Sequence, residues 1–358
     1  MEVVHPAVAG IDVHKKIIWV AVRLPGQHQP IIKTYRTFWR ALQKMATDLA
    51  ALGVTDVAME STGVYWWPVY HALAATGRIA VCVANAEHLK SVPGRKTDVR
   101  DCQWIAELHQ FGLLRPSFIP AQDVAALRAR TRYRKKLIEQ RTAEGQRLAK
   151  VLEDAGIKID SVATRLLGVS GRDMIEALIA GQRDPQTLAA LARGVLRRKS
   201  DDLVMACDGR FTGTHAAMCR LHLDAYDHAT ATITELDELV AQASAPFEPV
   251  IARLMTVPGI GRRTAEVIVA ETGGDMSRFP AAEQLAAWAG LAPGNRESAG
   301  KRRRAATRKG NTHLKAAMVE AAWSTGRTRS RIGARFRRLV RRFGKHNPRK
   351  QPLPSPIP

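Results

Sequence analysis

The sequence predicts an α/β domain at the N-terminus, a helical middle region and a mostly α-helical C-terminal region. Two patterns predict this order. Between residues 7 and 115, short runs of β-branched and aliphatic residues alternate with segments of helical periodicity. From residue 121 to about 245 almost no strand signal remains. With 358 residues, of which 46% are hydrophobic, the chain is long enough for two or three domains with cores of their own.

The N-terminal domain, residues 1–118, is expected to have three strands in a meander, followed by strands that alternate with helices. The expected strands cover residues 7–13, 17–22, 31–35, 54–60 and 79–83, and the expected helices cover 38–52, 65–75 and 98–111. This is the element order of an RNase H-like sheet. In that topology the first strand lies centrally beside the fourth, and the last helix packs across that edge.

The middle region, residues 119–248, is predicted to be a helical arm. Two long stretches of helical periodicity, 121–156 and 214–243, flank a shorter helical insert. This pattern indicates a protruding helical hairpin or coiled coil. Exposed positions of the first long helix carry many cations. We expect three of them to contact a nucleic-acid backbone, namely Arg128, Arg132 and Lys135.

Residues 249–330 are expected to form a mostly α-helical domain, and residues 331–358 a basic, partly disordered tail. The end of the tail contains five prolines, which regular secondary structure does not tolerate. Its beginning carries apolar residues at helical spacing, so part of the tail should fold against another element. These apolar residues are Ile332, Phe336, Leu339 and Phe343.

The charge of the chain is concentrated at one end. The formal net charge is +22, and residues 296–350 hold 19 lysines and arginines but only two acidic residues, Glu297 and Glu320. Such a block indicates a polyanionic partner, most often nucleic acid. No apolar run is long enough to span a bilayer, and the N-terminus does not resemble a secretory signal. The four cysteines are scattered without a CxxC pair, so we expect a cytoplasmic protein with no membrane association.

Four acidic residues at special positions predict a metal site. Asp12 lies within an apolar strand, Glu60 ends another, and Asp98 and Asp101 share one face of a helix. In the predicted topology these carboxylates converge, and like charges at one point require cations to neutralise them. Oxygen ligands suit Mg²⁺ or Mn²⁺, which also bind phosphate.

Two further segments are candidates for contact with nucleic acid. A Pro-Gly-Ile-Gly turn that opens a helix resembles a helix-hairpin-helix motif, with Gly259, Gly261 and Arg262 near phosphate, although glycines at a helix start also serve packing. Ser298 lies in a turn of small residues ahead of a run of cations. Its hydroxyl could attack a phosphodiester, although by spacing alone a serine in a loop is usually just a turn residue. The cations expected to hold phosphate there are Lys301, Arg302, Arg303, Arg304 and Lys309.

Several motifs of the chain are familiar. Gly-Ile-Asp-Val-His-Lys at 10–15, Glu-Ser-Thr-Gly-Val-Tyr-Trp at 60–66 and Lys-Thr-Asp-Val-Arg-Asp at 96–101 resemble the N-terminal DEDD domain of insertion sequence 110 family transposases. Val-Pro-Gly-Ile-Gly at 257–261 and the segment 290–315 resemble the C-terminal transposase domain of the same family. The motifs stand in the family's order, although Ala299 separates the serine from the glycine that commonly follows it.

The resemblance implies a RuvC-like recombinase that mobilises an insertion element through a circular intermediate. It implies a metal-binding tetrad of Asp12, Glu60, Asp98 and Asp101, and a nucleophile, Ser298, that forms a 5′-phosphoserine link to DNA. It further implies a structured bridge RNA that pairs with donor and target DNA. The family assembles as a tetramer, in which the RuvC-like domain of one subunit meets the serine of another.

Two other functions are compatible with the residues. One is a RuvC-like metal-dependent nuclease, in which a metal-bound water attacks and no covalent intermediate forms. The other is a non-catalytic nucleic-acid-binding protein whose acidic residues are structural. An actin-like ATPase is disfavoured, because no glycine-rich phosphate loop follows the predicted strands.

Overall fold

The chain divides at residues 119 and 120 into two compact units. The structure is a computed structural model. It describes residues 2–61, 63–85, 98–292, 297–298, 301–302 and 310–343. The four-part division into domains stays a prediction.

A mixed sheet of five strands forms the centre of the first unit, in the order β3-β2-β1-β4-β5. The strands are β1 (Val8–Val13), β2 (Ile17–Arg23), β3 (Ile31–Arg36), β4 (Asp56–Glu60) and β5 (Ala80–Ala84). β1 pairs antiparallel with β2 and parallel with β4, and β4 pairs parallel with β5. The first strand therefore lies centrally beside the fourth, which confirms the predicted topology.

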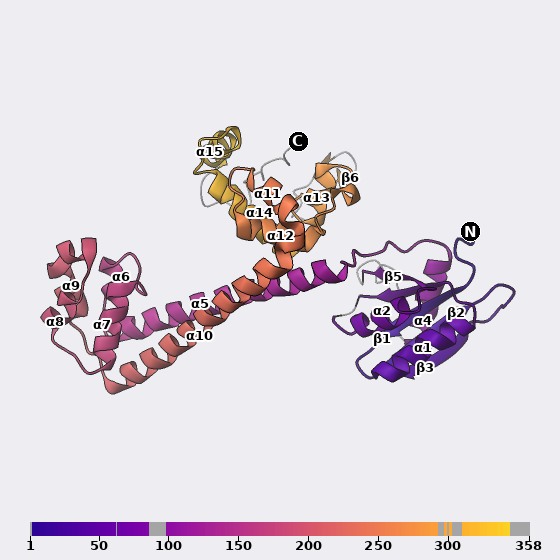
Figure 1. Cartoon of the computed structure of the whole chain (residues 1–358), viewed down its shortest axis with the longest axis horizontal. Helices are drawn as coiled ribbons and strands as arrows, with labels where there is room; N and C mark the ends of the chain where they lie inside the picture. Colours follow the sequence, from indigo (N-terminus) through magenta and orange to yellow (C-terminus); the bar gives the residue numbers. More distant parts are fainter. Residues whose placement is uncertain are drawn as a thin grey trace. The chain divides into compact units, whose positions relative to one another are not determined.

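Among the described residues of this unit, three helices cover the sheet, two on one face and one on the other (Figure 1). They are α1 (Trp39–Ala51), α2 (Trp66–Ala74) and α4 (Asp98–Gln110). The face under α1 and α2 carries large side chains, among them Ile11, Val20 and Met59. The face under α4 carries the smaller Ala21 and Ala58 among its fully buried residues, with the partly buried Trp19 and Ile32 packed beside them. Successive strand residues point to opposite faces, so this difference follows from the alternation in the sequence.

Gly10 allows α4 to lie unusually close to β1. A Cβ atom at this position would stand 2.2 Å from the carbonyl oxygen of Cys102 and 2.3 Å from the backbone nitrogen of Ala106. No side chain fits at such distances, because the obstructing atoms belong to the helix backbone. The backbones of the first strand and the last helix of this unit therefore pack directly on each other at this point.

The second unit is built on two long helices, α5 (Gln122–Asp154) and α10 (Gly213–Ser244), which lie side by side (Figure 1). Leu137 of α5 packs with Ile233 and Leu236 of α10. Between them the chain forms a small helical bundle with its own core. Its elements are α6 (Ile159–Val162), α7 (Val169–Ile179), α8 (Pro185–Ala190), η1 (Gly194–Lys199) and α9 (Ser200–Cys207). The predicted helical hairpin with a helical insert is therefore present.

The C-terminal helices pack on the first turns of α5 and the last turns of α10. Leu127 and Val240 from these two helices share a core with Val269 and Leu314. The elements are η2 (Ala245–Phe247), α11 (Glu248–Met255), α12 (Arg262–Thr272), η3 (Met276–Arg278), α13 (Ala282–Trp288), β6 (Glu297–Ser298), β7 (Lys301–Arg302), α14 (Thr312–Thr325) and α15 (Arg331–Phe343).

The beginning of the predicted tail is a helix, α15, which packs against α14. The rings of Trp323 and Phe336 meet edge to face with 5.3 Å between their centroids. This confirms that part of the basic segment folds against another element. Residues 344–358, which include the predicted disordered end, lie outside the described residues. None of the helices that the structure describes is long and apolar enough to cross a membrane.

The close packing at Gly10 predicts a large loss of stability on substitution. Gly10→Ala should lower the free energy of unfolding by about 3 kcal/mol, because the helix must move away from the strand or distort. Gly213→Ala is the control, since its added Cβ meets nothing within 4 Å. Chemical denaturation of the full chain measures both, and equal stability of the two variants would contradict the role given to Gly10.

Candidate active site

Asp12 and Glu60 lie next to each other at the ends of two paired strands. In the parallel register of β1 and β4, Ile11 stands opposite Met59, so the residues that follow them are neighbours. Asp12 is two residues beyond Gly10 and therefore points to the same face, the face covered by α4. Its side chain is only 14% exposed.

Helix α4 brings the other two predicted carboxylates to this edge. Asp98 and Asp101 lie in its first turn, and Cys102 and Ile105 are buried against the sheet. The carboxyl of Asp12 interacts electrostatically with those of Asp98 and Asp101, and Asp101 also interacts with Glu60. The four acidic residues predicted from the sequence are thus near one another in the folded unit.

The protonation equilibria of two of these acids reflect the crowding. Burial is the main cause that raises the pKa of Asp12 above its ordinary value, and the charges of Asp101 and Asp98 raise it further. Burial also raises the pKa of Asp101, together with the charges of Asp98 and Glu60. Each raised pKa means that a negative charge at this edge is costly while no cation is bound.

His14 is a member of the cluster that the sequence analysis missed. Its Nε2 atom lies 2.9 Å from Oδ2 of Asp12 and 3.5 Å from Oδ1 of Asp98. The charge of His14 and its hydrogen bond lower the pKa of Asp12, against the effects of burial and of the other acids. The sequence feature that could have identified His14 is its position two residues after Asp12, just beyond the end of the strand.

The donor set fits a hard divalent cation. One ligand atom from each of Asp12, His14 and Asp98 lies within 4.8 Å of the other two. The carboxylates supply oxygen ligands, and each raised pKa would be relieved by positive charge at the centre of the cluster. When bound, such an ion would orient a phosphate and neutralise charge that develops on it.

Ser298 lies in a short β-hairpin in the second unit. β6 pairs antiparallel with β7, with Ser298 opposite Lys301 and Glu297 opposite Arg302. The backbone therefore places the predicted nucleophile next to one of its predicted cations. Arg303, Arg304 and Lys309, which were also predicted to hold phosphate, lie outside the described residues.

Two family models match the chain, one at each end. The model for the DEDD domain of IS110 transposases, described as "Transposase", matches residues 9–157. The model described as "Transposase IS116/IS110/IS902 family" matches residues 251–337. The chain belongs to the IS110 family of transposases. The RNase H-like character of the family's DEDD domain agrees with the observed sheet, and the first model includes all four acids.

Individual relatives carry related descriptions. This transposase is 26% identical to a "Probable family 20 transposase" of Pseudomonas aeruginosa over 74% of its own length and 70% of that protein. It is 25% identical to the "Transposase for insertion sequence element IS1111A" of Coxiella burnetii, over 77% and 67% of the two chains. It is also 27% identical to the "Insertion element IS900 uncharacterized 42 kDa protein" of Mycobacterium paratuberculosis, over 72% of each.

Membership of the family establishes the class of reaction. Transposases cut and rejoin DNA, so the protein is an enzyme that acts on DNA. The DEDD family uses divalent metal ions, and the acidic cluster of the transposase has groups that could bind one.

The predicted helix-hairpin-helix motif is a turn between α11 and α12, and its first glycine serves packing. A Cβ on Gly259, which has a φ of +94°, would stand 2.1 Å from Oγ1 of Thr325. The same hydroxyl donates a hydrogen bond to the carbonyl of Pro258. Gly261 immediately precedes the first turn of α12, where an added Cβ would meet nothing within 4 Å. Contact of this turn with nucleic acid stays a prediction.

Several arginines predicted to bind nucleic acid are engaged within the second unit. Arg128 is 14% exposed and donates to the backbone carbonyls of Ala270 and Glu271. Arg132 forms two hydrogen bonds of 2.8 Å with the buried carboxylate of Glu271. Burial raises the pKa of Glu271, but the hydrogen bonds from Arg132 and Asn311, together with the charges of Arg132 and Arg128, outweigh burial and leave the pKa lowered.

Two more of the predicted cations also have acidic partners. Lys135 forms an ion pair with Glu320, and Arg262 forms ion pairs with Glu248 and Glu266. These interactions, like those of Arg128, join α5 to the C-terminal helices or fix α12 in place. The spacing of these cations in the sequence did not show that they hold the helices of this unit together. Phosphate contact by these side chains stays a prediction.

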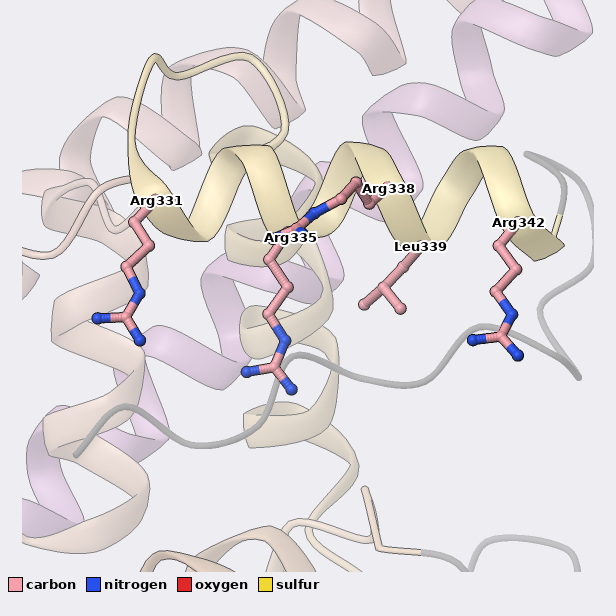
Figure 2. Close-up of a pocket in the computed structure, with 5 residues that line it drawn as sticks. All are labelled: Arg331, Arg335, Arg338, Leu339 and Arg342. Atoms are coloured by element: carbon pink, nitrogen blue, oxygen red, sulfur yellow. The ribbon is translucent and has the colours of Figure 1, made fainter.

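Helix α15 presents a row of arginines on its surface. Arg331, Arg335, Arg338 and Arg342 stand at helical spacing and line a surface depression together with Leu339. Figure 2 shows Arg331, Arg335 and Arg342 extending from one side of the helix. All four arginines are exposed. At a rise of about 1.5 Å per residue, the row is roughly 16 Å long, which suits several successive phosphates of a nucleic-acid strand.

Burial and the repulsion among the acidic residues oppose the negative charge of Asp12. Removing this charge should therefore stabilise the metal-free protein. Because the folded state raises the pKa of Asp12, its ionised form opposes folding above the ordinary pKa of 3.8. Asp12→Asn should therefore raise the unfolding temperature by about 1–3 °C at neutral pH in a chelator. The gain should vanish below that pKa, and Mg²⁺ should stabilise the wild type more than the variant.

Asp48→Asn is the matched control for this measurement. The hydrogen bond from Lys44 lowers the pKa of Asp48, so its replacement should leave the unfolding temperature unchanged or lower at neutral pH. A lower unfolding temperature of Asp12→Asn in chelator would refute the view that the cluster is strained without a cation.

Proposed function

We propose that this transposase cuts and rejoins the DNA of an insertion element with the acidic tetrad and a serine nucleophile. The tetrad comprises Asp12, Glu60, Asp98 and Asp101, which would hold Mg²⁺ or Mn²⁺. The observation that carries the proposal is the convergence of these four carboxylates from β1, β4 and α4. Bound ions would orient the scissile phosphate and neutralise its developing charge.

In the proposed covalent step, Ser298 is the nucleophile. Its hydroxyl oxygen attacks the scissile phosphorus and the bond to the 3′ oxygen breaks. The serine proton passes to water, and the leaving 3′ oxygen takes a proton from water. The products are a 5′-phosphoserine and a free 3′ hydroxyl. A 3′ hydroxyl of the exchanging strand then attacks the same phosphorus and releases the serine. The number of phosphoester bonds is conserved, so strand exchange needs no ATP.

Basic groups near the serine support this assignment. The hairpin places Lys301 opposite Ser298 and Arg302 one residue further along. Cations that reach the reacting phosphorus would stabilise a pentavalent transition state. The resemblance to the family supports a tetramer in which the tetrad of one subunit acts with the serine of another.

The basic block and the arginine row of α15 would hold nucleic-acid backbones. For duplex DNA, each phosphate neutralised should steepen the logarithmic salt dependence of binding by about 0.9. We further propose that a structured guide RNA pairs with donor and target DNA. Two observations support this guide RNA. They are the family resemblance and the formal net charge of the chain, +22.

Covalent trapping tests the serine. The wild-type protein, incubated with Mg²⁺ and labelled DNA that carries its own element ends, should give a protein–DNA adduct on a denaturing gel. Ser298→Ala should reduce adduct and strand transfer by about 1,000-fold or more, as loss of a nucleophile does. Ser277→Ala, a change at an exposed serine of the same unit, should retain both.

The outcomes separate the three candidate functions. Full cleavage by Ser298→Ala without an adduct would indicate a nuclease that uses water. Undiminished recombination by both Asp12→Asn and Asp101→Asn would indicate a non-catalytic nucleic-acid-binding protein.

Sequencing of RNA that co-purifies with the transposase tests the guide. A single structured species encoded in the element is expected, because recognition of RNA structure selects one RNA whereas charge alone does not. A random sample of cellular RNA would contradict guidance and leave only electrostatic binding.

A further inference from the structure

A second group of ligating side chains lies in the first unit, away from the acidic tetrad. His5, Asp56 and His109 each offer one ligand atom, and these atoms all lie within 4.8 Å of one another. The three come from the N-terminal segment, the first residue of β4 and the C-terminal turn of α4. The tetrad uses the opposite ends of the same strand and helix, about 13 Å away along the strand and about 16 Å along the helix.

Backbone hydrogen bonds hold the N-terminal segment in place. The backbone N–H groups of Val4 and His5 both donate to the carbonyl of Gln110, at 2.9 and 3.1 Å. The N–H of Thr55 donates to the carbonyl of Ala7 at 3.0 Å. His5 is therefore fixed against the end of α4 and the start of β4.

His109 carries a buried polar atom without a partner. The residue is 6% exposed, and its Nε2 forms no hydrogen bond with any described residue. Leaving a buried polar atom unpaired costs about 1–3 kcal/mol, so natural proteins rarely do so without a reason. The ring of His109 stacks on that of His5 with 4.6 Å between centroids. The unpaired atom therefore belongs to an imidazole pair beside a carboxylate.

A neighbouring hydroxyl orients the carboxylate of Asp56. Oδ1 of Asp56 lies 3.1 Å from Nδ1 of His5. The other carboxylate oxygen of Asp56, Oδ2, accepts a 2.7 Å hydrogen bond from the hydroxyl of Thr55. Such an outer hydrogen bond orients a ligating carboxylate.

We propose that His5, Asp56 and His109 bind one Zn²⁺ ion, with water as the fourth ligand. Two imidazoles and a carboxylate suit zinc, whereas Mg²⁺ and Ca²⁺ prefer oxygen ligands alone. Bonds of about 2.0–2.2 Å require the three ligand atoms to close slightly around the ion. His5 can adjust because its side chain is 31% exposed. The ion ties the end of α4 to β4 and the N-terminal segment, and so fixes the helix that carries Asp98 and Asp101.

Zinc binding by the full chain tests the site without DNA. The protein is stripped with a chelator and titrated with ZnCl₂ in excess Mg²⁺, which competes for the oxygen ligands of the tetrad. One equivalent of zinc should bind tightly. His5→Gln and Asp56→Asn should weaken its affinity by about 100-fold or more, since even outer partners of a metal ligand contribute about 10- to 100-fold.

Two controls make the result specific. His28→Gln changes an exposed histidine of the same unit and should bind zinc as the wild type does. Asp12→Asn, which alters the tetrad, should also retain the tight site. Circular dichroism confirms that each variant is folded.

Spectroscopy with Co²⁺ in place of zinc provides an independent readout. The wild type should show the intense visible absorption of a four-coordinate site with nitrogen ligands, and His5→Gln should lose it. Unchanged zinc affinity in His5→Gln and Asp56→Asn would overturn the proposal, as would loss of the tight site in Asp12→Asn. Neither result depends on whether Ser298 is the nucleophile.

Discussion

The distance between α4 and β1 is the constraint on which the acidic cluster depends. At Gly10 the helix backbone occupies the position that a side chain would take, with a carbonyl oxygen 2.2 Å from an ideal Cβ. Asp12 is two residues further along the same face of the strand, and Asp98 and Asp101 start the helix. Because strand and helix are rigid over these lengths, the close approach at one residue determines how near the carboxylates come. A larger residue would separate them.

The two faces of the sheet serve different purposes. Under α1 and α2 the large side chains form the main core of the unit, and their burial supplies most of its hydrophobic stabilisation. Under α4 several of the fully buried strand residues are small, such as Ala21 and Ala58, and bury less apolar surface. The face under α4 therefore buries less apolar surface, and the backbones of α4 and β1 lie closer together. The repulsion among the acids adds to this cost, and stability must come from the opposite face and from bound cations.

Positive charge in the second unit has two roles that composition does not separate. Near the ends of α5 and α10 that meet the C-terminal helices, Arg132 and Arg134 form ion pairs with Glu271 and Glu266, which are almost fully buried. Removal of either arginine would leave a buried carboxylate with fewer partners, which is destabilising. The exposed arginines of α15 instead line the surface. Ion pairs with buried acids therefore account for part of the positive charge of this unit.

The sequence by itself determined the order of the elements, the central place of β1 and the identity of the four acids. Alternation and helical periodicity are local properties, and few topologies accommodate that order of strands and helices. Only the tertiary structure decided which cations have acidic partners, that Gly259 serves packing against α14, and that His14 joins Asp12 and Asp98. It also brought His5, Asp56 and His109 together from across the first unit. Contacts between residues far apart in the chain depend on how close two backbones approach, and no local pattern in one sequence encodes that distance.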